Sequence, residues 1–530
     1  MSAIRERAMC WGEVRRGLGG GRRVAAVVLV VAVLVLPLAG CSGGLGDGVS
    51  TGSVPTPALA MFYAQKLSWS PCAPSECTYL QVPLDYNRPD GKIIRLAVLR
   101  HRASDPGKRI GSLVINPGGP GQSGTAAVAG IVKDVGSSPV GQRFDIVGFD
   151  PRGVGSSEPV IRCYTPREMD AVRREKSSDN SPPGLAEQTN QEKHYAAECG
   201  RRSGVDLLTN VGTRDVARDM DVLRSTLGDL KLTYLGWSYG TRLGYTYAEQ
   251  FPHNVRAMVL DGAVDPDQTE AQAQVATAVG FQQAFDSFAT WCAQQKQCPL
   301  GNDPKAATTT FRTLVNPTYD KPLPLADRRE LSYGDAIEGT IRALYGPWDW
   351  ETLRQGLTEL AAGHGATLMR LADKFNGRQP NGTYTGENDD LTAIRCVDDD
   401  PITDPAVLLD TRRRALAAMP FADLSDGPSP IPDQCSFWPA PPTSRPHQLN
   451  VPGLPQVMVV STTGDPATPY QAGINLARAL GARLLTAQGT QHTVALEAMS
   501  PCVDDVVTWY LADLVLPPER SRCTILPSSS

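Results

Sequence analysis

A serine between two glycines is the residue of this 530-residue chain whose surroundings point most directly to chemistry. Ser238 stands in the pentapeptide G-W-S-Y-G at positions 236–240, at the end of the strand-like run 232–236. The pattern G-x-S-x-G between a strand and a helix predicts a sharp turn that lifts the serine hydroxyl clear of the sheet. We therefore expect Ser238 to attack carbonyl carbons, with the backbone amide of Tyr239 facing the oxyanion that forms.

A serine nucleophile needs a base to take its proton, and histidine commonly fills that role. The chain has six histidines, and three of them follow Ser238 far enough along the chain to be candidates. His492 lies just past the last predicted strand, where a loop would bring it over the serine. His364 falls in a helical block, and His447 falls in a proline-rich connector. We predict His492 as the base, the alternative being a surface histidine without a catalytic role.

A carboxylate must orient that histidine, and two aspartates at strand ends are candidates. Asp465 stands in G-D-P-A-T-P at positions 464–469, after the predicted strand 456–461. Asp261 follows the predicted strand 256–260, a position that some hydrolases use, although it is also typical of a capping or turn residue. We favour Asp465.

The oxyanion needs a second donor besides the Tyr239 amide. The loop N-P-G-G-P-G at positions 116–121 follows a predicted strand, and successive glycines let backbone amides approach a ligand closely. We choose Gly119 as the donor and keep Gly118 as the alternative. A merely tight turn is the other interpretation of this loop.

The elements around these residues predict an α/β fold with a doubly wound, mostly parallel sheet. Two alternating runs, 78–84 and 93–101, predict an antiparallel hairpin, and later short apolar runs alternate with helix-length segments. Residues 266–439 break this alternation with amphipathic helical segments, so we expect a helical cap inserted between the sixth and seventh strands. The predicted parts are the first part of the core at 61–264, the cap at 265–440 and the second part of the core at 441–530.

The N-terminus predicts export. Arginines precede an apolar run at 24–38, about the length of a signal peptide core, and the run ends in L-A-G-C at 38–41. This resembles the lipobox of bacterial lipoproteins, in which Cys41 would be lipidated after cleavage. A tether at 42–60 would follow. We expect a protein held by lipid on the outer face of the membrane, with partial release; an ordinary signal peptide or an uncleaved anchor is the alternative.

The remaining cysteines suit an oxidising compartment. Without Cys10 and Cys41, ten of the twelve cysteines remain, an even set that fits five disulfides. Pairing between neighbours is the simplest of many connectivities and gives Cys72–Cys77, Cys163–Cys199, Cys292–Cys298, Cys396–Cys435 and Cys502–Cys523. No C-x-x-C pair and no histidine pair at ligand spacing is present, so we predict neither a metal nor a cofactor.

Four stretches together resemble a known family: the G-G-P-G loop, D-P-R-G-V-G-S-S at 150–157, G-W-S-Y-G and G-D-P-A-T-P. They are similar to α/β-hydrolases of the prolyl aminopeptidase type. They resemble more closely the exported tripeptidyl aminopeptidases of actinobacteria and their mycobacterial cell-envelope relatives. The likeness spans about 67–523 and implies the α/β-hydrolase fold with a triad of Ser238, Asp465 and His492. Asn116 and Gln491 depart from the prolyl aminopeptidase pattern, which usually has histidine and glycine there.

The resemblance implies a serine peptidase that releases short peptides from free N-termini. Such an enzyme needs carboxylates in its pocket wall to bind an ammonium group, and Asp398 and Glu338 are our candidates. An esterase or lipase acting on envelope lipids is the alternative, because the same triad cleaves both bonds. A non-catalytic binding lipoprotein is the third hypothesis. The net charge of −5 gives no reason to expect nucleic acid, and the oligomeric state stays open.

Overall fold

One ten-stranded sheet organises the part of the chain that the computed structural model describes, which is residues 57–174, 179–425 and 427–525. The predicted signal segment, Cys41 and most of the tether lie outside the described residues. In sheet order the strands are β1 (Ser70–Cys72), β2 (Ser75–Pro83), β3 (Ile93–His101), β5 (Phe144–Phe149), β4 (Gly111–Asn116), β6 (Leu232–Trp237), β7 (Val255–Asp261), β10 (Met458–Thr462), β11 (Arg483–Gln488) and β12 (Arg522–Thr524).

In the sheet order given above, neighbouring strands from β5 to β12 pair in parallel. The strands β1, β2 and β3 add an antiparallel edge beside β5. The predicted hairpin is therefore confirmed as β2 and β3, with Leu80 opposite Leu96. The parallel sheet agrees with the predicted fold class. The short outer strands β1 and β12 were not predicted, because three residues carry too weak a pattern.

Both faces of the sheet are covered, so every residue of β4, β5 and β6 is buried, and most of these residues are apolar. Alternate residues of β4 enter opposite cores: Leu113 and Ile115 pack with one set of helices, and Val114 packs with the other. The first set is α2 (Gly124–Val135), α3 (Pro139–Arg143) and α18 (Pro501–Asp513). The second set includes α7 (Thr213–Thr226), α8 (Tyr239–Gln250) and α17 (Tyr470–Leu480).

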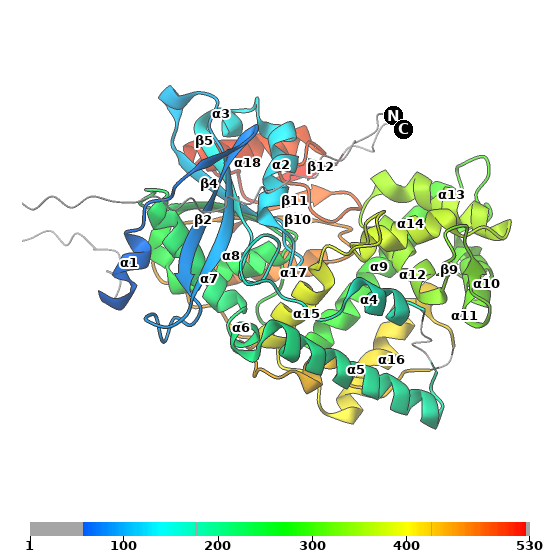
Figure 1. Ribbon diagram of the computed structural model, residues 1–530. Coiled ribbons are helices and arrows are strands. Elements are labelled where there is room, and N and C mark those ends of the chain that lie inside the picture. Colours follow the sequence, from blue (N-terminus) through cyan, green and yellow to red (C-terminus); the bar gives the residue numbers. More distant parts are fainter. Residues whose placement is uncertain (1–56, 175–178, 426, 526–530) are drawn as a thin grey trace, which may run out of the picture. The chain divides into compact units, whose positions relative to one another are not determined.

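A helical region separates β7 from β10 in the chain, and it occupies the right-hand side of Figure 1. It has its own core, in which Phe285 and Phe421 stack with ring centroids 4.8 Å apart. Its helices are α9 (Glu270–Cys292), α10 (Ala307–Val315), α11 (Pro317–Asp320), α12 (Tyr333–Leu344), α13 (Trp350–Ala361), α14 (Ala366–Phe375), α15 (Glu387–Asp398) and α16 (Pro405–Ala418), with a small hairpin of β8 (Leu323–Pro324) and β9 (Glu330–Leu331). The limits of the cap stay a prediction.

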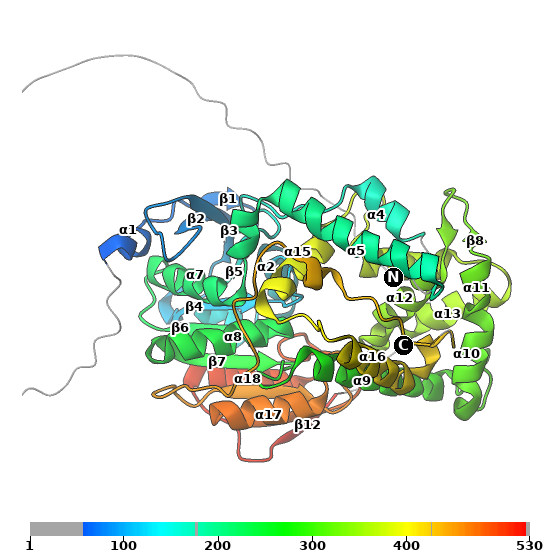
Figure 2. The same ribbon diagram turned by 90° about the horizontal axis from the view of Figure 1, so that it is seen from below.

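A second excursion from the sheet joins this helical region, and we did not predict it. The helices α4 (Pro166–Val172), α5 (Pro182–Ser203) and α6 (Val205–Thr209) lie between β5 and β6 in the chain. Figures 1 and 2 both place α4 and α5 beside the helices of the cap region. Contacts agree with the figures: the Tyr195 hydroxyl donates to Asp389 Oδ1 (2.8 Å), and the Cys163 amide donates to Asp389 Oδ2 (2.8 Å).

Five disulfides join cysteines in the described residues, and each joins neighbours along the chain. They are Cys72–Cys77, Cys163–Cys199, Cys292–Cys298, Cys396–Cys435 and Cys502–Cys523. The simplest pairing is thus the one that the structure has.

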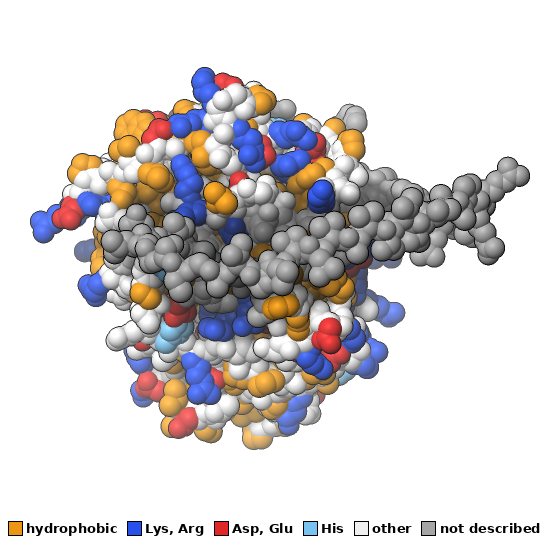
Figure 3. Space-filling view, turned by 90° about the vertical axis from the view of Figure 1, so that its left-hand side faces the viewer, with side chains coloured by type: hydrophobic (Ala, Val, Ile, Leu, Met, Phe, Trp, Pro, Cys, Tyr) orange, Lys and Arg blue, Asp and Glu red, His pale blue; other side chains and the backbone are white. Residues whose placement is uncertain are grey.

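The surface and the helices add two observations. On the face shown in Figure 3, basic and acidic side chains are interspersed with apolar ones, in keeping with a net charge of only −5. Within the described residues, no helix combines the length and the apolar character that a membrane span requires.

Candidate active site

Ser238 occupies a strained turn between β6 and α8. Its backbone has φ 55° and ψ −125°, a conformation that costs a side-chain-bearing residue on the order of 1–3 kcal/mol. The flanking glycines make the turn possible: a Cβ on Gly236 would lie only 2.4 Å from the carbonyl oxygen of Gly240. The Ser238 amide donates to the Asp261 carbonyl (2.8 Å), which fastens the turn to β7. The sequence pattern therefore corresponds to a nucleophile elbow in three dimensions.

His492 and Asp465 lie in hydrogen-bonding contact. His492 Nδ1 is 2.9 Å from Asp465 Oδ1 and 3.0 Å from Oδ2. Because an ionised carboxylate only accepts, the proton is on Nδ1, and Nε2 is left unprotonated to act as a base. Asp465 is fully buried and also accepts from the Thr468 amide (2.8 Å) and the Thr468 hydroxyl (2.9 Å).

Ser238 and His492 line one cavity of 620 Å³, which we call the active-site cavity. Among the hydrogen bonds of the described residues, none joins Ser238 Oγ to His492 Nε2. Contacts of this kind in empty sites often tighten only when substrate binds. The His492 amide donates to the carbonyl of Tyr345 on the helical region (2.8 Å), and the two rings meet edge to face. The helical region therefore helps to hold the base.

The electrostatics at His492 suit a base that works near neutral pH. Burial lowers the pKa of His492, but the charge of Asp465 and its hydrogen bond outweigh burial, so the pKa lies above its ordinary value of about 6.5. A nearby negative charge stabilises the imidazolium that would form as the serine loses its proton.

Asp261, the rival for the acid, contacts the backbone beyond His492. Its Oδ2 accepts from the amides of Val494 (2.6 Å) and Ala495 (2.7 Å). Burial raises the pKa of Asp261 to about 6, although these two hydrogen bonds oppose the rise. The structure thus places Asp465 at the imidazole and Asp261 under the loop that carries it.

The two candidate oxyanion donors, the amides of Gly118 and Gly119, differ in whether they are already hydrogen-bonded. The Gly118 amide already donates to Asn116 Oδ1 (3.0 Å), whereas the Gly119 amide makes no hydrogen bond among the described residues. A Cβ on Gly118 would lie 2.9 Å from Ser238 Cβ and 3.1 Å from the Tyr239 nitrogen, so the loop and the elbow are in close contact. Both glycines have positive φ, 97° and 103°. The asparagine at position 116 takes up one amide and leaves the next one available.

The other two candidate histidines do not line the active-site cavity, although His447 lines a second cavity that also reaches Ser238. His447 Nε2 is 3.0 Å from Glu249 Oε1, and His364 is exposed on the helical region. No group of three His, Cys, Asp or Glu side chains in the described residues is placed to hold a metal ion.

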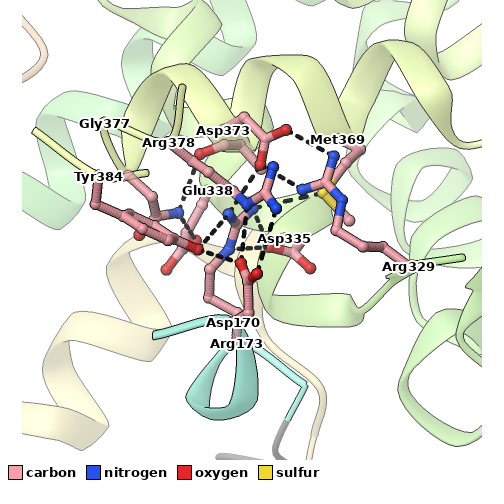
Figure 4. Close-up of polar contacts among 12 residues, drawn as sticks. Asp170, Arg173, Arg329, Asp335, Glu338, Met369, Asp373, Gly377, Arg378 and Tyr384 are labelled. Carbon is pink, nitrogen blue, oxygen red and sulfur yellow. Dashed lines mark hydrogen bonds and ion pairs between the residues drawn. The ribbon is translucent and has the colours of Figure 1, made fainter. Parts of the chain in front are cut away.

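Glu338, a predicted ammonium-binding residue, lies in a polar cluster of the helical region. Figure 4 shows it among charged side chains of the helical region and of the segment that follows β5. Its Oε2 accepts from Asn376 Nδ2 (2.6 Å), and burial raises its pKa to about 7. Glu338 does not line the active-site cavity, and this placement counts against the predicted role.

Asp398, the other candidate, is already paired. It lines a second cavity of 320 Å³ that also reaches Ser238 and Tyr239, but it accepts from the Thr213 amide (2.8 Å) and the Thr213 hydroxyl. Arg242 Nε lies 3.8 Å from Asp398 Oδ2. Because Asp398 already accepts these hydrogen bonds and lies near the Arg242 cation, it is less available to pair with a substrate ammonium. This placement counts against the predicted role.

Two glutamates that the sequence did not single out line the active-site cavity. Glu387 begins α15 and forms neither a hydrogen bond nor an ion pair through its carboxyl group among the described residues; burial raises its pKa. Glu497 lies close to Thr493 Oγ1 (3.2 Å), and burial raises its pKa to about 8. No local pattern marks either residue, since both depend on what faces them across the cavity.

Comparison with known proteins decides the family. The model for the alpha/beta hydrolase fold matches residues 111–498. The chain belongs to this family. Serine protease Hip1 of Mycobacterium tuberculosis is 44% identical, covering 94% of this chain and 98% of the relative. Carboxylesterase B of the same species is 42% identical (92% and 94%), and the tripeptidyl aminopeptidase of Streptomyces lividans is 32% identical (84% and 84%). This member of the α/β-hydrolase family is a serine hydrolase of the actinobacterial type that the motifs indicated.

Proposed function

We propose that this α/β-hydrolase is a serine peptidase that cleaves peptides near a free N-terminus through an acyl-enzyme on Ser238. One observation supports the serine chemistry most directly. His492 is hydrogen-bonded to Asp465 and lines the same cavity as Ser238, whose backbone is strained. The names of two relatives, a serine protease and a tripeptidyl aminopeptidase, support peptides as the substrate.

The mechanism follows from the positions of these groups. His492 Nε2 takes the Ser238 proton as Oγ bonds to the scissile carbonyl carbon, and the amides of Tyr239 and Gly119 donate to the resulting oxyanion. The proton then passes from Nε2 to the leaving amine nitrogen as the C–N bond breaks, which leaves an ester on Ser238. Water attacks that ester, gives its proton to Nε2, and the peptide acid departs as Oγ regains a proton.

Glu387 is our candidate for binding the substrate ammonium in place of Asp398 and Glu338. Its carboxyl group lines the cavity of Ser238 and has no partner among the described residues. Burial raises its pKa by disfavouring the charged form, and a bound ammonium would reverse that effect. Glu387 would thus distinguish a free N-terminus from a blocked one.

The first test separates a hydrolase from a binding protein. Wild-type protein should be labelled by a fluorophosphonate, and Ser238→Ala should not. Equal labelling of both proteins would contradict an acyl-enzyme on Ser238.

The second test compares free and N-acetylated peptides with acyl esters as substrates. Acetylation should raise KM at least 10-fold in the wild type, because one charge-assisted hydrogen bond contributes about 1.5–3 kcal/mol. Glu387→Gln should lose this preference, and the exposed Glu330→Gln should keep it. Rapid turnover of long-chain acyl esters without peptide cleavage would favour the esterase, a function that the name of one relative suggests.

We also propose that the protein is exported and anchored through a lipid on Cys41. The L-A-G-C sequence and the five disulfides support this, since disulfides persist in oxidising compartments. Cys41→Ala should prevent incorporation of labelled palmitate in the native host. Undiminished incorporation would contradict the proposed anchor.

A further inference from the structure

The residue that supplies one oxyanion donor is also held by its side chain. Tyr239 is the first residue of α8, and its hydroxyl contacts Thr213 Oγ1 at the start of α7. Thr213 Oγ1 also contacts Asp398 Oδ2, and the Thr213 amide donates to Asp398 Oδ1 (2.8 Å). Asp398 is the last residue of α15. A chain of polar contacts therefore connects the elbow to a helix of the cap region.

The hydrogen bonds in this chain have one possible direction while Asp398 is ionised. A carboxylate only accepts, so Thr213 donates its single hydroxyl proton to Asp398 and accepts from the Tyr239 hydroxyl. Burial raises the pKa of Tyr239 well above its ordinary value, which keeps the phenol protonated as a donor. All three side chains are buried, with Thr213 and Asp398 each 1% exposed, so water competes little for these bonds.

Arg242 attaches the same turn of α8 to α15 at a second point. It lies three residues after Tyr239, and its Nη2 donates to the Asp398 carbonyl (2.9 Å). Its Nη1 donates to both carboxylate oxygens of Asp399 (2.9 Å each). The guanidinium also supplies the positive charge that a buried Asp398 requires.

The helix that receives these contacts is itself held firmly. Near its end, Cys396 is bonded to Cys435, and near its start Asp389 accepts from Tyr195 and Cys163. A helix fixed at both ends can serve as a reference for the first turn of α8.

We propose that Asp398 and Thr213 are positioning residues that hold the Tyr239 amide in the oxyanion hole through the Tyr239 hydroxyl. Oxyanion donors work only when they are fixed to within about 0.5 Å, and these contacts restrain the residue that carries the donor amide. Asp398 thus acts through Tyr239 on the transition state, and it does not contact the substrate ammonium. This inference rests on the proposed serine chemistry.

The test removes the Tyr239 hydroxyl and compares this variant with one that lacks a buried tyrosine hydroxyl elsewhere. Tyr239→Phe breaks the contact to Thr213 and leaves the Tyr239 amide in the chain. Tyr86→Phe is the control, because it removes a buried tyrosine hydroxyl that donates to a different buried carboxylate, Asp219 Oδ1 (2.7 Å). Removing an oxyanion donor outright costs about 10²–10³ in kcat, and we expect a smaller loss from misplacing one. Tyr239→Phe should lower kcat about 10-fold with KM within about 2-fold, and Tyr86→Phe should leave kcat unchanged.

A second readout separates positioning from general destabilisation. Binding of a peptide boronic acid, which forms a tetrahedral adduct on serine, should weaken in Tyr239→Phe by the same factor as kcat. Asp398→Asn should show the same parallel losses. The inference is overturned if Tyr239→Phe matches Tyr86→Phe in kcat and boronate affinity, or if both variants lose activity in proportion to a fall in melting temperature. Failure of the proposed function would look different, because Ser238→Ala would then keep its labelling and activity.

Discussion

The imidazole of His492 lies near two buried aspartates that serve different parts of the same loop. Asp465 accepts a hydrogen bond from the imidazole ring. Asp261 accepts hydrogen bonds from the amides of Val494 and Ala495, two and three residues after His492. Identical side chains thus differ in role because each one meets a different partner. The net effect on His492 is a raised pKa.

That raised pKa predicts the pH dependence of activity. The imidazole must be neutral to act as a base, so kcat/KM should fall as the pH drops through the pKa of His492 in the free enzyme. Because Asp465 raises this pKa, the midpoint should lie above 6.5. In Asp465→Asn the midpoint should move to lower pH, and kcat should fall about 10⁴-fold through loss of the correct tautomer. A wild-type midpoint at or below 6.5, from kcat/KM measured between pH 5 and 9, would contradict this assignment.

At the scale of elements, a cluster of charges ties the segment after β5 to the helical region. Arg173 is the centre of the cluster in Figure 4. Its guanidinium lies 2.7 Å from Asp335 Oδ1 and 2.8 Å from Asp373 Oδ1, with its side chain 10% exposed. The excursion that carries α4 and α5 is thereby fixed to α12 and α14. Removing one partner of such a buried pair leaves the other charge uncompensated.

Breaking this cluster should destabilise the fold. Arg173→Met keeps an unbranched apolar stem and leaves Asp335 buried without its cation, at a cost of about 3–5 kcal/mol. The matched control is Arg413→Met, because Arg413 pairs with Asp410 at an exposed site and should show no measurable loss. Urea unfolding followed by circular dichroism would measure both. Equal stability of the two variants would contradict a structural role for the cluster.

At the scale of the whole molecule, the disulfides differ in the lengths of chain that they close. Cys396–Cys435 closes a separation of 39 residues and fixes α15, whereas Cys72–Cys77 closes a separation of 5 at the sheet edge. Loop-closure entropy grows with the logarithm of loop length. The longer crosslink should therefore stabilise the fold more.

Paired cysteine-to-alanine variants would measure this difference. Loss of Cys396–Cys435 should cost about 4 kcal/mol and loss of Cys72–Cys77 about 2 kcal/mol, according to the loop-entropy relation. Melting temperatures without reductant give the order, and reductant should remove the difference between each variant and the wild type. A larger loss from the Cys72–Cys77 pair would show that loop length does not govern the stabilisation.

Several features were predictable from the sequence because they depend on local patterns and chain order. The G-W-S-Y-G turn, the apolar strands and the serine, acid, histidine order identified the fold, the two residues Ser238 and His492 that line one cavity, and the Asp465 that accepts a hydrogen bond from His492. The pairing of neighbouring cysteines also required no tertiary information beyond proximity in the chain. An elbow and a buried strand impose their own residue types, so they leave a signature within a few positions.

Only the tertiary structure decided the roles of the other acidic residues. Asp398 was predicted to bind substrate, yet it meets Thr213 across 185 residues of chain, and Glu338 is enclosed in a cluster that includes Arg173. Glu387 faces the cavity because of how α15 packs, and no neighbour in sequence indicates it. A carboxylate has the same chemistry everywhere in a sequence. Its function depends on burial and on the charges and donors around it, which come together only when distant segments fold against each other.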